Sequence, residues 1–272
     1  MSTSSPPPAD PAPLASAVAG VGWAVTTRLL DDAALAAAQA ACDRALATAP
    51  LGPYGAIVHD AWRGDPALAA LVPTLAPVAA AALGLAEVVL FQDHLIAKPA
   101  GGDHALPWHQ DFSFWPLDRP DGVTLWLALD DVDLDSGGLG YVSGSHLGGE
   151  RAARWGLVGP DDPRARLPPL DDALLATATI PTVSAGAALL HHPLTWHASG
   201  ANRSPRPRRA WSSSWLAATV AWAPEHAPHP ATALVRPAAG APLDARYPRF
   251  TAPGLAAPAA AGAGGSASST AR

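Results

Sequence analysis

The chain is poor in lysine, in cysteine and in basic charge. Its 272 residues include one lysine and one cysteine, and the formal net charge is −6. An acidic chain has no overall basic field that would attract nucleic acid or an anionic membrane surface. Cys42 has no second cysteine for an internal disulfide, which is consistent with a reducing compartment. We therefore expect neither nucleic acid nor a membrane as a partner.

Targeting signals are also missing from the sequence. The opening residues, MSTSSPPPADPAP, contain no basic segment followed by an apolar one. No stretch of about 20 residues is uniformly apolar, as a membrane-spanning helix would require. The expected location is the cytoplasm.

Composition predicts one folded domain between two disordered tails. Residues 1–13 are mainly Ser, Pro and Ala, and residues 251–272 are almost entirely Ala, Gly, Pro, Ser and Thr. Neither segment carries enough apolar surface to offset the entropy lost on ordering. Residues 14–250 are expected to form a single domain, since a β-barrel or β-sandwich of this size commonly counts as one.

The first part of this domain, residues 31–85, is expected to be helical. Asp31 or Asp32 can cap a helix that is rich in alanine and leucine and ends near residue 49. A second helical region over residues 67–85 contains Pro73 and Pro77, which are expected to interrupt it.

The second part, residues 87–219, has the pattern of a β core. Runs of β-branched and aromatic residues are separated by Gly, Pro and Asp. Many short strands that follow helices predict a mainly β fold with flanking α-helices, built on a double-stranded β-helix, or jelly roll. The expected strands are 88–98, 123–129, 140–142, 187–190 and 210–219.

His109 and Asp111 form a His-x-Asp pair. On an extended segment the two side chains would point to the same face, so an imidazole and a carboxylate could share a cation. The pair alone is unspecific, because 10 His and 20 Asp in a chain of this length give about 0.7 such pairs by chance. A third ligand, His197, would complete the two-histidine, one-carboxylate triad of non-haem Fe(II) oxygenases.

Further blocks follow in a fixed order. The segment WLALDDVDLDSGGLGYVSGSH ends at His146, His197 opens an H-A-S-G-A-N segment, and Arg208 stands eleven residues after His197. Over residues 88–217 this order resembles the phytanoyl-CoA dioxygenase family of Fe(II)/2-oxoglutarate oxygenases. Ala198 stands where that family usually has glycine, and Ser143 where it usually has proline; neither change removes a ligand.

The resemblance implies an enzyme with three cofactors or cosubstrates: Fe(II), 2-oxoglutarate and dioxygen. His109, Asp111 and His197 would hold the metal. Arg208 would bind the distal carboxylate of 2-oxoglutarate, for which a guanidinium offers a planar fork. Supporting candidates for the cosubstrate are Ser199, Gln92 and Trp126, and Phe112, Phe114 and Trp115 surround the His-x-Asp pair and could line a substrate pocket.

Other histidines compete for the same roles. His191 and His192 are rival third ligands, but they lack the following Ser-Gly-x-Asn, and adjacent strand residues face opposite ways. His104 has no aspartate two positions later, so it is a candidate to lie near the metal rather than to bind it. Alternatively, Arg208 has no specific ligand and is one of four solvated arginines in a basic segment, with Arg203, Arg206 and Arg209.

Three functions are consistent with these patterns. The first is a dioxygenase that hydroxylates an unactivated C–H bond of a small molecule. The second uses the same cofactors but ends in epimerisation, desaturation or cyclisation. The third is a non-catalytic jelly roll with a structural metal or none. One lysine against 16 arginines, with abundant alanine and proline, suggests a GC-rich bacterial genome, where natural-product tailoring is common.

Overall fold

The computed structural model describes residues 11–151, 171–227, 237–243 and 246–252. Ordered elements extend slightly into both predicted tails. Helix α1 (Pro11–Gly20) begins before residue 14, and strand β11 (Arg249–Thr251) ends after residue 250. The rest of the two predicted tails, 1–10 and 253–272, lies outside the described residues.

The two predicted helices are present, and the first begins at the expected cap. The prediction that all of residues 31–85 are helical is wrong, because this part also contains the short strands β2 (Leu51–Gly52) and β3 (Gly55–His59). Asp31 accepts a hydrogen bond from the backbone N–H of Ala34 at 2.8 Å, so α2 begins at Asp32 and runs to Leu46. Asp65 caps α4 in the same way, and Gly84 ends it in the left-handed conformation, with φ of 64°. The helix bounds are α2 Asp32–Leu46, α3 Ala61–Gly64, α4 Pro66–Leu83 and α5 Asp172–Leu175, with 3₁₀ turns η1 Asp111–Phe114 and η2 Ser145–Gly148.

The expected interruption of the second helix is wrong, because α4 continues through Pro73 and Pro77. Pro73 is exposed and Pro77 is half-buried, so the carbonyls that lose an N–H partner lie toward solvent, where water can satisfy them. The opposite face of α4 buries Leu68, Val72 and Leu75. Burial of this face offsets the cost of the missing hydrogen bonds.

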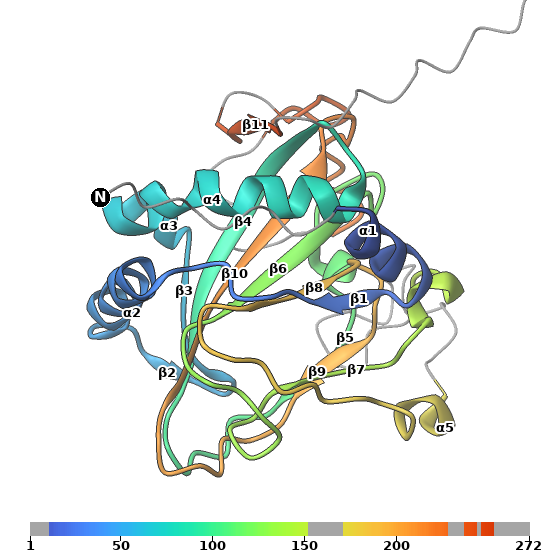
Figure 1. The fold of residues 1–272 in the computed structure, drawn as a ribbon. Coiled ribbons are helices and arrows are strands. Elements are labelled where there is room, and N and C mark those ends of the chain that lie inside the picture. Colours follow the sequence, from blue (N-terminus) through green and yellow to red (C-terminus); the bar gives the residue numbers. More distant parts are fainter. Residues whose placement is uncertain (1–10, 152–170, 228–236, 244–245, 253–272) are drawn as a thin grey trace, which may run out of the picture.

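The sequence was expected to contain no apolar segment long enough to span a membrane, but helix α4 is nearly such a segment. Its 18 residues meet simple length and composition criteria for a membrane span. Core helices meet the same criteria, and α4 packs on strands β4, β6 and β10 of the large sheet. Figure 1 shows α4 lying across one face of that sheet.

Within the described residues, antiparallel strands form one eight-stranded and one three-stranded sheet. The large sheet has the order β1-β8-β6-β10-β4-β3-β2, with β11 paired to β4, and the small sheet has the order β5-β9-β7. The strands predicted from the sequence are all present to within a few residues. The bounds are β1 Trp23–Val25, β2 Leu51–Gly52, β3 Gly55–His59, β4 Glu87–Lys98, β5 Leu106–His109, β6 Gly122–Ala128, β7 Leu139–Tyr141, β8 Ala188–His191, β9 His197–Ser199 and β10 Arg208–Ala217.

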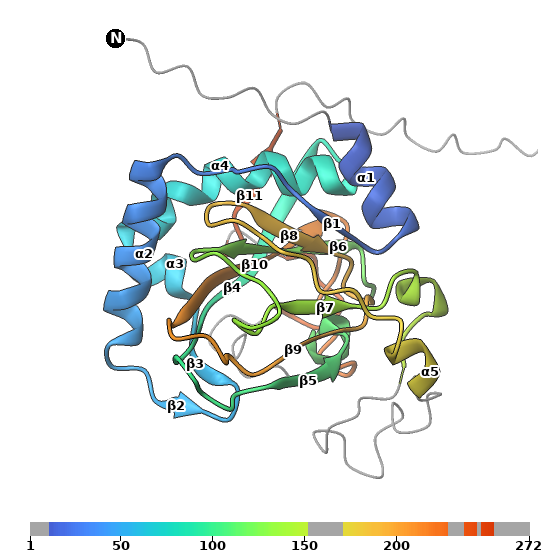
Figure 2. The same cartoon turned by 60° about the horizontal axis from the view of Figure 1, so that its bottom comes forward.

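The two faces of the large sheet have different roles. Its outer face packs on α2 and α4 through a core cluster that includes Leu90, Leu125, Trp211 and Trp215. The small sheet lies on the other side, as Figure 2 shows. This arrangement is the jelly roll predicted from the sequence, and the space between its sheets holds an apolar cluster that includes Trp126, Leu139 and Leu189, together with buried polar residues such as His109, His197 and Arg208.

Candidate metal centre and adjoining cavity

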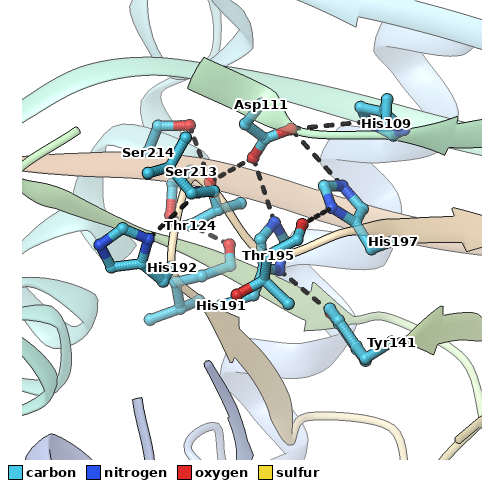
Figure 3. Close-up of polar contacts among 12 residues, drawn as sticks. His109, Asp111, Thr124, Tyr141, His191, His192, Thr195, His197, Ser213 and Ser214 are labelled. Carbon is cyan, nitrogen blue, oxygen red and sulfur yellow. Dashed lines mark hydrogen bonds and ion pairs between the residues drawn. The ribbon is translucent and has the colours of Figure 1, made fainter. Parts of the chain in front are cut away.

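Three predicted ligands meet between the two sheets (Figure 3). His109 ends β5 and lies opposite His197 of β9 in the strand register. Asp111 does not continue the strand; it is the first residue of the 3₁₀ turn η1. Ligand atoms of His109, Asp111 and His197 all lie within 4.8 Å of one another. His109 and Asp111 were expected to lie on one extended segment. They are instead brought together by the end of a strand and the tight turn that follows it.

The backbone selects one tautomer for each histidine ligand. Nδ1 of His109 lies 2.9 Å from the carbonyl oxygen of Pro107, and Nδ1 of His197 lies 2.9 Å from that of Thr195. A carbonyl only accepts, so each Nδ1 carries the proton, and in the neutral ring Nε2 keeps its lone pair. Both Nε2 atoms lie 3.5 Å from Oδ1 of Asp111. Two imidazole nitrogens and one carboxylate oxygen that converge in this way are the donor set that a divalent cation accepts.

Charge in the site also suits a metal. Burial opposes ionisation of Asp111, but the electrostatic effect of nearby His197 and the hydrogen bond from Nε2 of His191 hold the pKa of this carboxyl well below its usual value. Burial and the neighbouring His197 lower the pKa of His109. An ionised carboxylate beside a neutral imidazole is the protonation state that metal binding requires.

Arg208 lies in a cavity beside this centre. The cavity has about 280 Å³ of empty volume, part of it open to solvent, and is lined by Arg208, Trp126, Ser199 and Lys98 among others. The Arg208 side chain is 2% exposed, and its Nη2 donates to the carbonyl oxygen of Gly137 at 3.1 Å. Its Nε and Nη1 find no acceptor in the described part of the chain. A buried guanidinium with free donors is suited to bind an anion such as a carboxylate.

The adjacent arginine is oriented differently. Arg209 forms ion pairs with Asp43 and Asp130, at 2.9 and 2.6 Å. The structure therefore separates Arg208 from the solvated basic run, as the alternation of strand residues predicted.

Lys98 is a residue of this cavity that sequence reasoning did not single out. It is 1% exposed, and its ammonium donates to Oγ of Ser199 at 2.7 Å and to the carbonyl oxygens of Ser199 and Gly200. These acceptors are neutral, so they do not cancel its charge. Burial, together with the positive charge of Arg208, lowers the pKa of Lys98 to about 7. The sequence feature that could have drawn attention to Lys98 is that it is the sole lysine of the chain.

The other cosubstrate candidates line the same interior. The ring of Trp126 lies 5.2 Å from the guanidinium carbon of Arg208, within cation–π range. Ser199 accepts from Lys98, as described above. Gln92 is 6% exposed on β4, and its Oε1 has no hydrogen-bond partner in the described structure. Its strand register places Gln92 beside Ser214.

The three aromatic residues after the His-x-Asp pair separate into two environments. Phe112 and Trp115 are 6% and 1% exposed and belong to a core cluster with Phe91 and Leu117. Phe114 is half-buried, and its ring centroid lies 6.1 Å from that of His109. Of the three, Phe114 is the one that is partly exposed.

The rival histidines are not part of the three-residue metal cluster. His191 is buried, and its Nε2 lies 3.1 Å from Oδ2 of Asp111. His192 packs beside His146, with ring centroids 5.2 Å apart, and its Nδ1 accepts from the backbone N–H of Leu194. His104 lies half-buried in the loop between β4 and β5.

The fold and this ligand set define a jelly-roll protein with a two-histidine, one-carboxylate centre. Residues 21–210 match the model of the phytanoyl-CoA dioxygenase (PhyH) family, and the chain belongs to that family. The resemblance seen in the sequence is thereby confirmed.

Individual relatives are similar over part or all of their length. The chain is 37% identical over 157 residues to phytanoyl-CoA dioxygenase domain-containing protein 1 of Bos taurus, covering 54% of this chain and 52% of the relative. It is 31% identical over 156 residues to L-proline trans-4-hydroxylase of Streptomyces griseoviridis, covering 47% and 56%. The chain thus spans about half the length of these curated relatives.

A solved structure matches over a larger share of both chains. The epimerase SnoN of nogalamycin biosynthesis, crystallised with Fe3+, alpha ketoglutarate and nogalamycin RO, is 26% identical and superposes with a TM-score of 0.71. The match covers 89% of this chain and 99% of that one.

Proposed function

We propose that this chain is an Fe(II)- and 2-oxoglutarate-dependent dioxygenase that hydroxylates an unactivated C–H bond of a small molecule in the cytoplasm. The observation that carries the proposal is the presence of two neighbouring groups. Ligand atoms of His109, Asp111 and His197 converge within 4.8 Å, and buried Arg208 has two nitrogens with no acceptor among the described residues. The first suits a divalent cation and the second a carboxylate. Together they match the two ends of iron-bound 2-oxoglutarate.

Each residue has a distinct part in this function. His109, Asp111 and His197 would hold the iron through two Nε2 atoms and Oδ1. Arg208 would bind the distal carboxylate of 2-oxoglutarate, with Trp126 and Ser199 around it, and Lys98 adds a second positive charge. Gln92, which pairs with Ser214 in the register, would contact the cosubstrate away from Arg208. When bound, iron and 2-oxoglutarate supply an oxidant derived from dioxygen, with succinate and carbon dioxide as coproducts. Phe114 would contact the substrate, and Phe112 and Trp115 would support that wall from the core.

The domain proposal follows the described elements. The helices pack on one face of the large sheet and the small sheet lies on its other face, so residues 14–250 are proposed to act as one catalytic domain. The net charge of −6 disfavours nucleic acid or an anionic membrane as partner.

The second candidate function uses the same cofactors but ends in epimerisation, desaturation or cyclisation of the substrate. The match to the epimerase SnoN favours it, because that protein shares the fold at 26% identity over nearly its whole length. Substrate position relative to the metal would decide between hydroxylation and epimerisation, desaturation or cyclisation. For either reaction, we propose that the substrate is an intermediate of natural-product tailoring. A non-catalytic barrel is disfavoured, since it would have no use for the unpaired donors of Arg208.

The proposal is tested by cosubstrate binding and turnover. Calorimetry should show 2-oxoglutarate binding to protein loaded with Mn(II), and little binding without metal. Protein loaded with Fe(II) under anaerobic conditions should then release succinate slowly when oxygen is admitted, even without the substrate. Omission of iron is the control. Failure of 2-oxoglutarate to bind the Mn(II)-loaded protein would refute the oxygenase function.

Cosubstrate binding should also depend on pH through Lys98. Its pKa is about 7 in the folded protein against 10.5 for a free lysine, so at pH 8 the amine is mostly neutral. A bound dianion favours the charged amine, so binding at pH 8 should take up about one proton, and affinity should fall by up to about tenfold per pH unit above 7. Calorimetry in buffers of different ionisation enthalpy measures this uptake.

The control for this pH dependence is a matched pair of variants. Lys98→Met should abolish the proton uptake, whereas Arg206→Met, which removes a basic side chain at an exposed position, should retain it. Equal 2-oxoglutarate affinities of the wild type at pH 7 and pH 9 would contradict the role given to Lys98.

A further inference from the structure

The two oxygens of the Asp111 carboxylate have different surroundings. Oδ1 faces the Nε2 atoms of His109 and His197, at 3.5 Å from each. Oδ2 instead accepts from Oγ1 of Thr124 at 2.7 Å and lies 3.1 Å from Nε2 of His191. One oxygen thus faces the two predicted histidine ligands, and the other is held by Thr124 and His191 (Figure 3).

The contact with His191 has a defined direction. An ionised carboxylate only accepts hydrogen bonds, so Nε2 of His191 carries the proton that it donates to Asp111. Nδ1 of His191 lies 3.0 Å from the hydroxyl of Tyr141, and in the neutral ring it accepts from that hydroxyl. Burial and the charge of Asp111 raise the pKa of Tyr141 well above its usual value, so the hydroxyl keeps its proton.

This chain of hydrogen bonds joins the two sheets. His191 lies on β8 of the large sheet, opposite Thr124 of β6 in the register. Tyr141 lies on β7 of the small sheet, opposite His197 of β9. His191 is 1% exposed and Tyr141 is 0% exposed. One buried network therefore holds Asp111 from the large sheet and connects it to the strand pair that carries His197.

We propose that His191 is a positioning residue which, with Tyr141, orients the Asp111 carboxylate so that Oδ1 faces the metal. The inference rests on the metal centre of the proposed function. Both nitrogens of His191 are engaged in the network, so it acts on the metal through Asp111 and not as a ligand. Outer contacts of this kind typically change metal affinity by about 10- to 100-fold.

The test is metal affinity and ligand-field spectrum, neither of which needs turnover. Co(II) titration of the wild type should give a dissociation constant and a visible absorption band. His191→Phe keeps a ring of similar size but removes both hydrogen bonds, so Co(II) affinity should fall about 10- to 100-fold and the band should shift. His191→Gln, whose amide can still donate to Oδ2, should recover most of the affinity. Tyr141→Phe removes only the hydroxyl and should give a smaller loss in the same direction.

The controls are the same substitutions at the neighbouring position. His192→Phe and His192→Gln change a histidine that contacts His146 and Leu194 rather than Asp111, so Co(II) affinity and spectrum should stay at wild-type values. Unchanged Co(II) affinity and spectrum in both His191→Phe and Tyr141→Phe would overturn the role of His191 while leaving the proposed function intact. A wild type that binds no Co(II) would overturn both.

Discussion

Replacing Asp111 with alanine is expected to weaken Mn(II) or Fe(II) binding by about a thousandfold and to abolish succinate release. Two unit charges about 4 Å apart, at an effective dielectric constant near 20, attract by about 4 kcal/mol, which corresponds to that factor; the double charge of the metal makes this a lower bound. The cation would be left with two neutral imidazoles. Metal titration followed by anaerobic iron loading and oxygen addition measures both effects.

Two further variants separate charge from shape at this position. Asp111→Asn keeps the size of the side chain but removes its charge, so it should lose most of the metal affinity as well. Asp32→Asn changes a carboxylate that is 93% exposed on α2 and should bind metal as the wild type does. Retention of tight metal binding by Asp111→Ala would contradict the ligand assignment.

Replacing Arg208 with methionine is expected to raise the dissociation constant of 2-oxoglutarate by about a hundredfold while metal binding stays unchanged. Two charge-assisted hydrogen bonds to a carboxylate, at about 1.5 kcal/mol or more each, account for this factor. Arg208→Lys should recover only part of the affinity, because an ammonium lacks the planar fork. Calorimetry with the Mn(II)-loaded variants distinguishes these outcomes.

The same substitution should not destabilise the protein without cosubstrate. Two of the Arg208 nitrogens are buried without acceptors among the described residues. A buried charge without a partner carries a desolvation cost of several kcal/mol, which an apolar side chain removes. Thermal melting should therefore give a midpoint equal to or above that of the wild type. The matched control is Arg209→Met, which breaks ion pairs with Asp43 and Asp130 and should lower the melting midpoint but spare 2-oxoglutarate affinity. The reverse pattern would show that Arg208 has a structural role.

Local patterns in the sequence account for much of the fold. The Asp31 cap and the β-branched runs predict α2 and the main strands, because they depend on neighbours within a few residues. The continuation of α4 through Pro73 and Pro77 was not predicted, since it depends on which face of the helix packs on the sheet. The turn that begins at Asp111 was missed for a similar reason: strand pairing with β9 ends at His109.

The residues of the candidate site could be predicted where their spacing along the sequence follows a recognisable pattern. His109, Asp111, His197 and Arg208 form an ordered set, and the structure places the three ligands together with Arg208 in the adjoining cavity. Contacts across the interior have no such spacing. The partners Thr124, Tyr141 and His191 come from three strands of two sheets, so only the register reveals that they meet around one carboxylate. No pattern along the chain predicts that register.

Burial of the sole lysine beside Arg208 makes the cosubstrate cavity accessible to NMR without any engineered label. Protein grown with isotope-labelled lysine would give one lysine side-chain signal, and that signal would arise from Lys98. Its chemical shift would report the protonation of the amine and its displacement when a dicarboxylate enters. Candidate cosubstrates and inhibitors could then be ranked by a single resonance in the intact, unmodified enzyme.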